Sequence, residues 1–151
     1  MIIVIVVIFS MIPMFLPEML GYQSYSVVSG SMVPEIPVGS IVLVKSAEPS
    51  QIVEGEIIVF ESPVESGMVI THRVVTNDTA GRQFVTKGDA NDQQDVNPVP
   101  YSNLIGRVEK HYPRMGYIMQ VLSSLEGKIL LISIFVTAII LNCISSYLKN
   151  E

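Results

Sequence analysis

The 151-residue chain contains a single cysteine, Cys143, and this scarcity limits the chemistry that the protein can support. One cysteine cannot form an intrachain disulfide, and two widely separated histidines, His72 and His111, do not complete a zinc-ligand pattern with it. The chain also lacks an excess of basic residues, because its formal net charge is −5. We therefore expect no metal ion, no other cofactor and no nucleic-acid partner.

Charged residues are also missing from two apolar segments, one near each end of the sequence. Residues 129–148 carry no charge over 20 positions, which is long enough for a helix to cross the hydrocarbon core of a membrane. Residues 2–16 are almost entirely apolar and have neither a basic start nor a small-X-small cleavage site after them, which favours an uncleaved anchor over a cleavable signal peptide. The predicted parts are an N-terminal transmembrane anchor at 1–20, a middle domain at 21–128, a C-terminal transmembrane helix at 129–148 and a tail at 149–151.

The middle domain lacks a helical hydrophobic period between Gly21 and Pro113 and instead has short segments rich in β-branched residues. Gly, Pro, Asn and Asp residues separate these segments. We predict strands at residues 41–45, 56–60, 68–75, 83–87 and 105–109. The predicted fold class is mainly β, a barrel-like or folded sheet flanked by two transmembrane helices. The sequon that begins at Asn77 lies in a predicted turn, where a chance match is favoured over glycosylation.

The sequence Ser-Gly-Ser-Met-x-Pro at residues 29–34 contains the candidate nucleophile, Ser31. Gly30 allows a close backbone approach to a substrate, and Pro34 restricts the local turn. A serine hydroxyl is a weak nucleophile until a neighbouring base takes its proton. Taken alone, the motif fits a flexible turn after a membrane anchor better than an active site, because Ser-Gly-Ser is common in loops.

His72 is the candidate base, since it lies in a predicted strand and histidine accepts protons near neutral pH. The alternative is a hydrogen-bonded surface histidine. We interpret His111, which precedes Tyr112 and Pro113, as an interfacial or loop residue. A carboxylate that accepts the ring N–H would fix the tautomer of His72. Three candidates for this acid follow within residues 87–98: Asp89, Asp92 and Asp95.

A calcium loop is the competing interpretation of the acidic segment at residues 87–98. Asp89 and Asn91 match the first two ligands of such a loop, but Gln93 occupies the third ligand position. No glycine follows at Gln94, and Pro100 stands where the closing glutamate belongs. The sequence therefore disfavours calcium binding.

Taken together and in order, these motifs resemble the type I signal peptidase family. The resemblance is closest to its serine–histidine branch, found in archaea, in the endoplasmic reticulum complex and in some Gram-positive bacteria. It covers nearly the whole chain and rests on the serine motif after an apolar anchor, a Gly-acid-hydrophobic strand, the histidine strand and Lys-Gly-Asp-x-Asn at 87–91. The bacterial lysine branch has a lysine where this chain has His72. Ser40 and Glu56 stand where the family usually has aspartate, which concerns turn stability rather than activity.

The resemblance implies a role for each candidate residue. Ser31 is the implied nucleophile, His72 the general base and Asp95 the acid that orients His72. Asp89 is implied as a second, supporting acid, and the Ser29 hydroxyl as an oxyanion donor beside the backbone N–H of Ser31. The implied enzyme is a membrane-bound serine endopeptidase that removes signal peptides from secreted and membrane preproteins without a cofactor.

The resemblance also implies a multi-pass protein of the cell membrane whose middle domain lies outside the cytoplasm. The basic residues near the second apolar segment favour the opposite orientation, but long loops translocate largely regardless of charge. The implied partners are preprotein signal peptides, membrane lipid and the translocation channel. Two alternatives stay open: a related membrane peptidase that processes a narrow set of surface proteins, and a non-catalytic β module tethered to the membrane.

Overall fold

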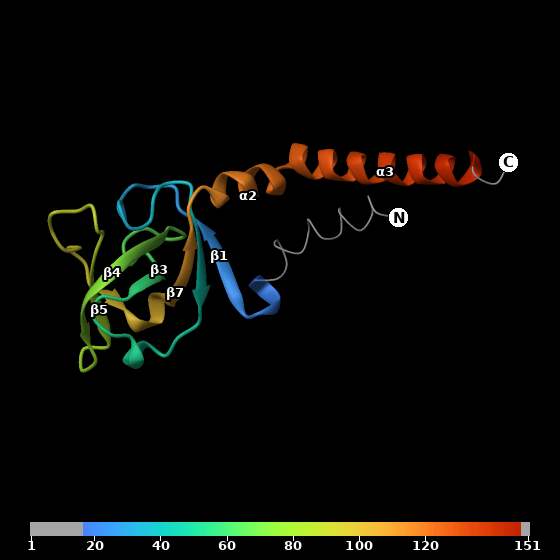
Figure 1. Ribbon diagram of the computed structural model, residues 1–151. Coiled ribbons are helices and arrows are strands. Elements are labelled where there is room, and N and C mark those ends of the chain that lie inside the picture. Colours follow the sequence, from blue (N-terminus) through green and yellow to red (C-terminus); the bar gives the residue numbers. More distant parts are fainter. Residues whose placement is uncertain (1–16, 149–151) are drawn as a thin grey trace.

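The computed structural model describes residues 17–148 as a β domain followed by two helices (Figure 1). The strands are β1 (Tyr22–Ser26), β2 (Ile41–Lys45), β3 (Ile57–Glu61), β4 (Val69–Asp78), β5 (Gln83–Lys87), β6 (Val99–Pro100) and β7 (Leu104–Tyr112). The helices are α2 (Met115–Ser123) and α3 (Leu125–Leu148), and 3₁₀ turns lie at Pro49–Gln51 and Tyr101–Asn103. Residues 1–16 of the predicted anchor and the predicted tail at 149–151 lie outside the described residues.

The seven strands form one antiparallel sheet in the order β1-β2-β7-β3-β4-β5-β6. Each of the five predicted strands is present, β2 and β5 with the predicted ends and β3, β4 and β7 with shifted ends, and the mainly β class is confirmed. The prediction missed β1, whose Tyr22–Ser26 sequence is mostly polar, and the two-residue β6. Register shifts in three of the strand pairs bend the sheet into a half barrel.

Two clusters of buried side chains form the core of the β domain. One consists of Ile52, Ile58, Phe60, Val74, Phe84, Val99 and Tyr101. The other consists of Val27, Met32, Ile36, Val42, Val44 and Val59. Met32 and Ile36 come from the loop between β1 and β2 rather than from a strand, so this loop is part of the core.

The two helices lead away from the β domain (Figure 1). Among the described residues, α3 is the helix long and apolar enough to cross a membrane, over Leu125–Ser145. It begins at Leu125 rather than at the predicted residue 129, because Ser124 caps it: the Ser124 hydroxyl oxygen accepts the Gly127 N–H at 3.0 Å. Helix α2 lies within the range assigned to the middle domain, and its Gly116 N–H donates to the Gly39 carbonyl at 2.9 Å.

Two polar residues outside the candidate site have structural positions that the sequence did not predict. His111 lies in β7 opposite Val42, so its interpretation as a loop residue is wrong. Asn77, the first residue of the sequon, lies in β4 and donates from its amide nitrogen to the carbonyls of Pro49 (2.9 Å) and Ile52 (2.7 Å). The Asn77 side chain therefore ties the 3₁₀ turn to β4.

Candidate active site

The loop of residues 27–40, which we call the serine loop, is closed at its base by backbone hydrogen bonds. The Val27 N–H donates to the Ser40 carbonyl at 2.9 Å, and the Gly39 N–H donates to the Val27 carbonyl at 2.8 Å. Gly39 has a φ of +80°, which glycine adopts without the clash that a Cβ would cause. The serine loop therefore leaves and re-enters the sheet at one point.

Ser31 sits beside a buried anchor within this loop. Met32 and Ile36 are 1% and 0% exposed, and the Ile36 N–H donates to the Met32 carbonyl at 2.8 Å. Ser31 itself is half-buried and Ser29 is exposed, with their hydroxyl oxygens 3.3 Å apart. Burial of Met32 fixes the backbone next to Ser31, while the Ser31 hydroxyl stays within reach of solvent and substrate.

His72 and Asp95 form a hydrogen-bonded pair. His72 lies in the middle of β4 opposite Ile58 of β3 and is buried, with 8% of its surface exposed. Its Nδ1 atom lies 2.6 Å from Oδ2 of Asp95. The same carboxylate oxygen accepts the hydroxyl of the fully buried Thr86 at 2.6 Å. Of the three candidate acids, Asp95 is therefore the one in contact with the imidazole.

Gly88 marks the point where the serine loop approaches His72. A Cβ placed on Gly88 would lie 2.7 Å from the Ser31 carbonyl oxygen and 3.0 Å from Nε2 of His72. Both atoms therefore face the same small space. The Ala90 N–H donates to the Ser31 carbonyl at 2.9 Å, which ties the turn after β5 to the serine loop. The serine loop, β4 and the turn after β5 are far apart in the sequence and thus meet here. Figure 1 shows the curved sheet that brings them together.

The backbone of Ser31 and the His72 ring both border the space at Gly88, but the Ser31 hydroxyl makes no hydrogen bond to the ring. Within residues 17–148, the side-chain contact of Ser31 Oγ is the one with Ser29, and no hydrogen bond reaches Nε2 of His72. A serine hydroxyl changes partner by rotation about χ1, and catalytic hydrogen bonds commonly tighten when substrate binds. The arrangement leaves the Nε2 side of the ring facing Ser31 and the Nδ1 side held by Asp95.

Asp89 pairs with Arg73 and not with His72, the partner that an orienting acid would need. Its two carboxylate oxygens accept from the guanidinium of Arg73 at 2.8 and 2.6 Å, and Arg73 also donates to the Gly55 carbonyl at 2.7 Å. The hydrogen bonds with Asp89 raise the pKa of Arg73 above its ordinary value. Asp89 therefore fastens the turn after β5 to β4, and the exposed Asp92 lies beyond it on the same turn.

The two positions that depart from the family pattern both keep a turn-closing hydrogen bond. The Ser40 hydroxyl donates to the Pro37 carbonyl at 2.6 Å. The Glu56 carboxylate accepts the Val53 N–H at 3.0 Å and also pairs with Arg107 at 2.7 Å. Serine and glutamate therefore supply local bonds at these positions, and among residues 17–148 neither side chain is hydrogen-bonded to His72.

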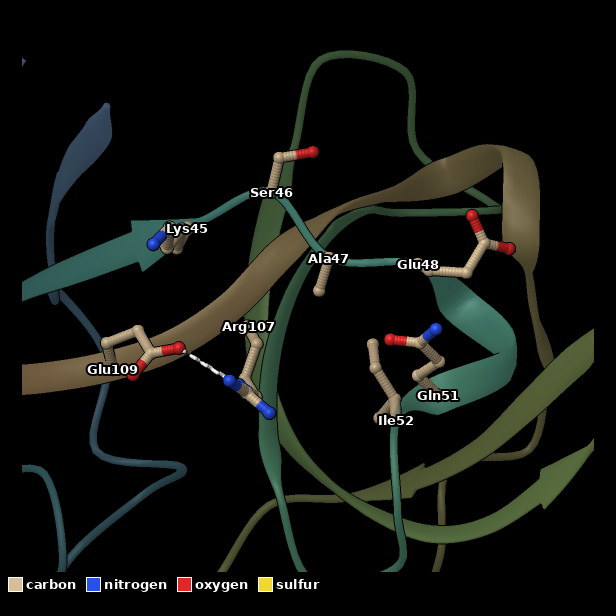
Figure 2. Close-up of a pocket in the computed structure, with 8 residues that line it drawn as sticks. All are labelled: Lys45, Ser46, Ala47, Glu48, Gln51, Ile52, Arg107 and Glu109. Carbon is tan, nitrogen blue, oxygen red and sulfur yellow. Dashed lines mark hydrogen bonds and ion pairs between the residues drawn. The ribbon is translucent and has the colours of Figure 1, made fainter. Parts of the chain in front are cut away.

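A hollow of about 270 Å³ lies elsewhere on the domain, and it shares no residue with the Ser31–His72–Asp95 group. It is lined by Lys45, Ser46, Ala47, Glu48, Gln51, Ile52, Arg107 and Glu109 (Figure 2). The Arg107 guanidinium at its wall is held by Glu109 at 2.6 Å and by Glu56 at 2.7 Å. Both carboxylates pair with the guanidinium, so the charge of Arg107 is compensated within the protein.

Sequence reasoning gave no role to three residues that build the site: Thr86 and Arg73, and Gly88, which it used only as part of the Lys-Gly-Asp-x-Asn motif. Thr86 gave a usable signal, because it alternates with Phe84 in β5 and so shares the inward face, where a hydroxyl requires a partner. Gly88 is needed because of a close approach between segments distant in sequence, which no local pattern reveals.

Comparison with known proteins supports the family that the motifs resemble. The family described as signal peptidase, peptidase S26, matches residues 1–79, a segment that contains Ser31 and His72. Signal peptidase I W of Bacillus subtilis (strain 168) is 37% identical over 91 residues, which cover 58% of this chain and 47% of that relative. The match thus spans about half the length of the relative. With a histidine at position 72, as in the serine–histidine branch, the chain belongs to the signal peptidase family, peptidase S26.

Proposed function

We propose that this protein is a membrane-bound serine endopeptidase that removes signal peptides from preproteins. The observation that supports this proposal most strongly is the hydrogen bond between His72 Nδ1 and Asp95 Oδ2, with His72 Nε2 and the Ser31 backbone facing one small space. A nucleophile, a base and an acid that orients the base are the groups that acyl transfer requires. Their occurrence in a member of the peptidase S26 family connects this chemistry to signal peptides.

The proposed reaction begins when Nε2 of His72 takes the proton of the Ser31 hydroxyl. Oγ of Ser31 attacks the carbonyl carbon of the scissile peptide bond, and the carbonyl oxygen becomes an oxyanion. The carbon–nitrogen bond then breaks, and His72 gives its proton to the departing amine. Water attacks the acyl-enzyme with His72 again as base, which releases the carboxylate product and restores Ser31.

Two further roles complete the proposed site. The proposed oxyanion donors are the backbone N–H of Ser31 and the hydroxyl of Ser29, and the 3.3 Å between the Ser29 and Ser31 hydroxyl oxygens supports the role of Ser29. Asp89 acts as a supporting acid through Arg73, because this ion pair holds the turn that bonds to the Ser31 carbonyl. Asp89 supports the backbone around the site and does not touch the imidazole.

The proposed setting is the outer surface of the cell membrane. Helix α3 is one span, residues 1–20 supply a second, and the β domain between them lies outside the cytoplasm. An apolar signal peptide in the same membrane then presents its cleavage site at the level of the serine loop, and shared confinement raises its effective concentration. An extended peptide can pair with exposed backbone of the sheet, as peptides do when they add a strand. Lipid and the translocation channel are the expected neighbours.

Cleavage of a full-length precursor by the full-length protein in detergent tests the proposal. We expect Ser31→Ala and His72→Ala each to abolish cleavage, because each removes a group that handles the transferred proton. Ser24→Ala, an exposed serine on β1, and His111→Ala, the other histidine, are the matched controls and are expected to cleave normally.

The outcomes separate the alternatives. Full cleavage by Ser31→Ala would overturn Ser31 as the nucleophile, and absence of cleavage by the unsubstituted protein would favour a tethered β module without peptidase activity. Loss of cleavage on adding a chelator would contradict a metal-free mechanism. A panel of precursors distinguishes a general signal peptidase, which cleaves many, from a peptidase that cleaves one or two surface proteins.

A further inference from the structure

Thr86 holds Asp95 by two reciprocal hydrogen bonds. Its hydroxyl lies 2.6 Å from Oδ2 of Asp95, and its backbone carbonyl accepts the Asp95 N–H at 2.8 Å. Thr86 is fully buried in β5, whereas Asp95 lies in the irregular segment that follows it. One strand residue therefore fixes both the backbone and the carboxylate of a loop residue.

The hydrogen-bond inventory determines the direction of the side-chain bond. A carboxylate only accepts hydrogen bonds, so the Thr86 hydroxyl donates to Oδ2. The same oxygen lies 2.6 Å from Nδ1 of His72, which must then carry its proton. With the proton on Nδ1, a neutral imidazole has its lone pair on Nε2, the atom that faces the Ser31 backbone across Gly88.

The sheet register brings Thr86 and His72 to the same face. Thr86 pairs with Val74 of β4, and Val74 is two residues from His72. Side chains two apart in a strand point the same way, and His72, Val74 and Thr86 are all buried. The pairing of β4 with β5 therefore sets the distance between Thr86 and the imidazole, and the Asp95 carboxylate bonds to both.

We propose that Thr86 is a positioning residue for the Asp95–His72 pair. This inference rests on the proposed function, in which His72 is the base. By fixing Oδ2, Thr86 stops the Asp95 carboxylate from turning away from Nδ1 and so keeps Nε2 directed at Ser31. If Thr86 only filled space between β4 and β5, a methyl group in place of its hydroxyl would leave cleavage unchanged.

Thr86→Val tests this distinction, because valine has the shape of threonine without the hydroxyl. We expect kcat for precursor cleavage to fall about 10-fold with KM little changed, far less than the roughly 10⁴-fold cost of removing an orienting carboxylate's charge. Thr86→Ser, which keeps the hydroxyl, should restore most of kcat. Val74→Ala is the matched control, since it opens a cavity beside the same pair, should lower the melting temperature and should leave kcat unchanged.

A second measurement does not depend on cleavage. The proton on His72 Nδ1 is observable by NMR in ¹⁵N-histidine-labelled protein, and its resonance is sharp when the hydrogen bond to Asp95 is fixed. We expect the resonance to broaden or vanish in Thr86→Val and to persist in Thr86→Ser and Val74→Ala. If Thr86→Val does not fold, Thr86→Ala is measured in its place against the same two controls.

The two measurements separate failure of this inference from failure of the proposed function. Normal kcat and a normal Nδ1 proton resonance in Thr86→Val would overturn the positioning role and leave the peptidase intact. Absence of cleavage by the unsubstituted protein would overturn the proposed function, and the resonance alone would then decide whether Thr86 holds the pair. Equal loss in Thr86→Ser and Thr86→Val would also reject the role of the hydroxyl.

Discussion

Two polar clusters on the same sheet, one around Arg107 and one around His72, differ in whether the central side chain keeps a nitrogen without a hydrogen-bond partner. Around Arg107, the carboxylates of Glu109 and Glu56 hold one guanidinium at 2.6 and 2.7 Å, and Figure 2 shows the contact with Glu109. Around His72, the bonds run from Thr86 to Asp95 and on to Nδ1, and within residues 17–148 none ends on Nε2. The first cluster is complete without a substrate, whereas the second has an imidazole nitrogen available beside a serine.

The difference teaches how structural and chemical polar groups can be told apart in this fold. Arg107 is the more exposed group. Its pKa is raised, mainly by its hydrogen bond with Glu109 and then by that with Glu56, so Arg107 stays charged and forms a surface ion pair. His72 is buried, and within residues 17–148 its ring is hydrogen-bonded at Nδ1 and not at Nε2. A proton acceptor needs that open side, because it must change protonation state during a reaction.

Asp95→Asn is the change expected to have the largest effect on this comparison. Asparagine keeps the shape but offers an N–H or an uncharged oxygen to Nδ1, so the tautomer and the imidazolium both lose support. We expect kcat for precursor cleavage to fall by about 10⁴-fold, by analogy with the serine-protease triad. Cleavage kinetics measure this fall in kcat, with the wild-type and variant proteins compared at the same fraction of folded protein. Wild-type turnover in Asp95→Asn would remove the distinction between the two clusters.

Gly88→Ala compared with Gly106→Ala should give a smaller difference in activity. A Cβ on Gly88 enters the space between the Ser31 carbonyl and Nε2 of His72, whereas one on Gly106, beside Arg107, meets the Lys45 carbonyl at 2.3 Å. Displacement by about 1 Å at reacting groups costs roughly 10²-fold, so we expect that loss in kcat for Gly88→Ala. Gly106→Ala should instead lose about 1–3 kcal/mol of stability with kcat retained. The reverse pattern would place the reacting groups at the Arg107 cluster.

Asp89→Asn and Glu109→Gln give the smallest expected effects. Asp89 makes two bonds to a partly buried arginine, so its loss should cost about 1–2 kcal/mol in chemical denaturation, while the exposed Glu109 should cost about 0–0.5 kcal/mol. Because the hydrogen bonds with Asp89 raise the pKa of Arg73, the arginine stays charged across the neutral range, and its contribution is lost as pH rises through that raised value. Equal losses at about pH 6 and about pH 8 are therefore expected. A kcat loss in Asp89→Asn matching that of Asp95→Asn would contradict its supporting role.

Local pattern predicted much of the fold but not its edges. The strands at Ile41–Lys45 and Gln83–Lys87 were predicted with their observed ends, because β-branched residues and flanking turns define them. The polar edge strand β1 was missed, since it forms through backbone pairing with β2 rather than through burial of its own side chains. Asn77 was placed in a turn because its sequence is polar, and its partners Pro49 and Ile52 are more than twenty residues away.

The sequence by itself determined the types of groups present, the strand-rich middle domain, the apolar C-terminal helix and the family. Ser31, His72 and Asp95 could be proposed because motifs record residue identity and order. Tertiary structure alone decided which acid meets His72, that Thr86 stands behind it and that Gly88 keeps the gap open. The physical reason is that hydrogen bonds of 2.6 Å between groups 9 and 23 residues apart depend on strand register and sheet curvature, which arise from packing the whole domain.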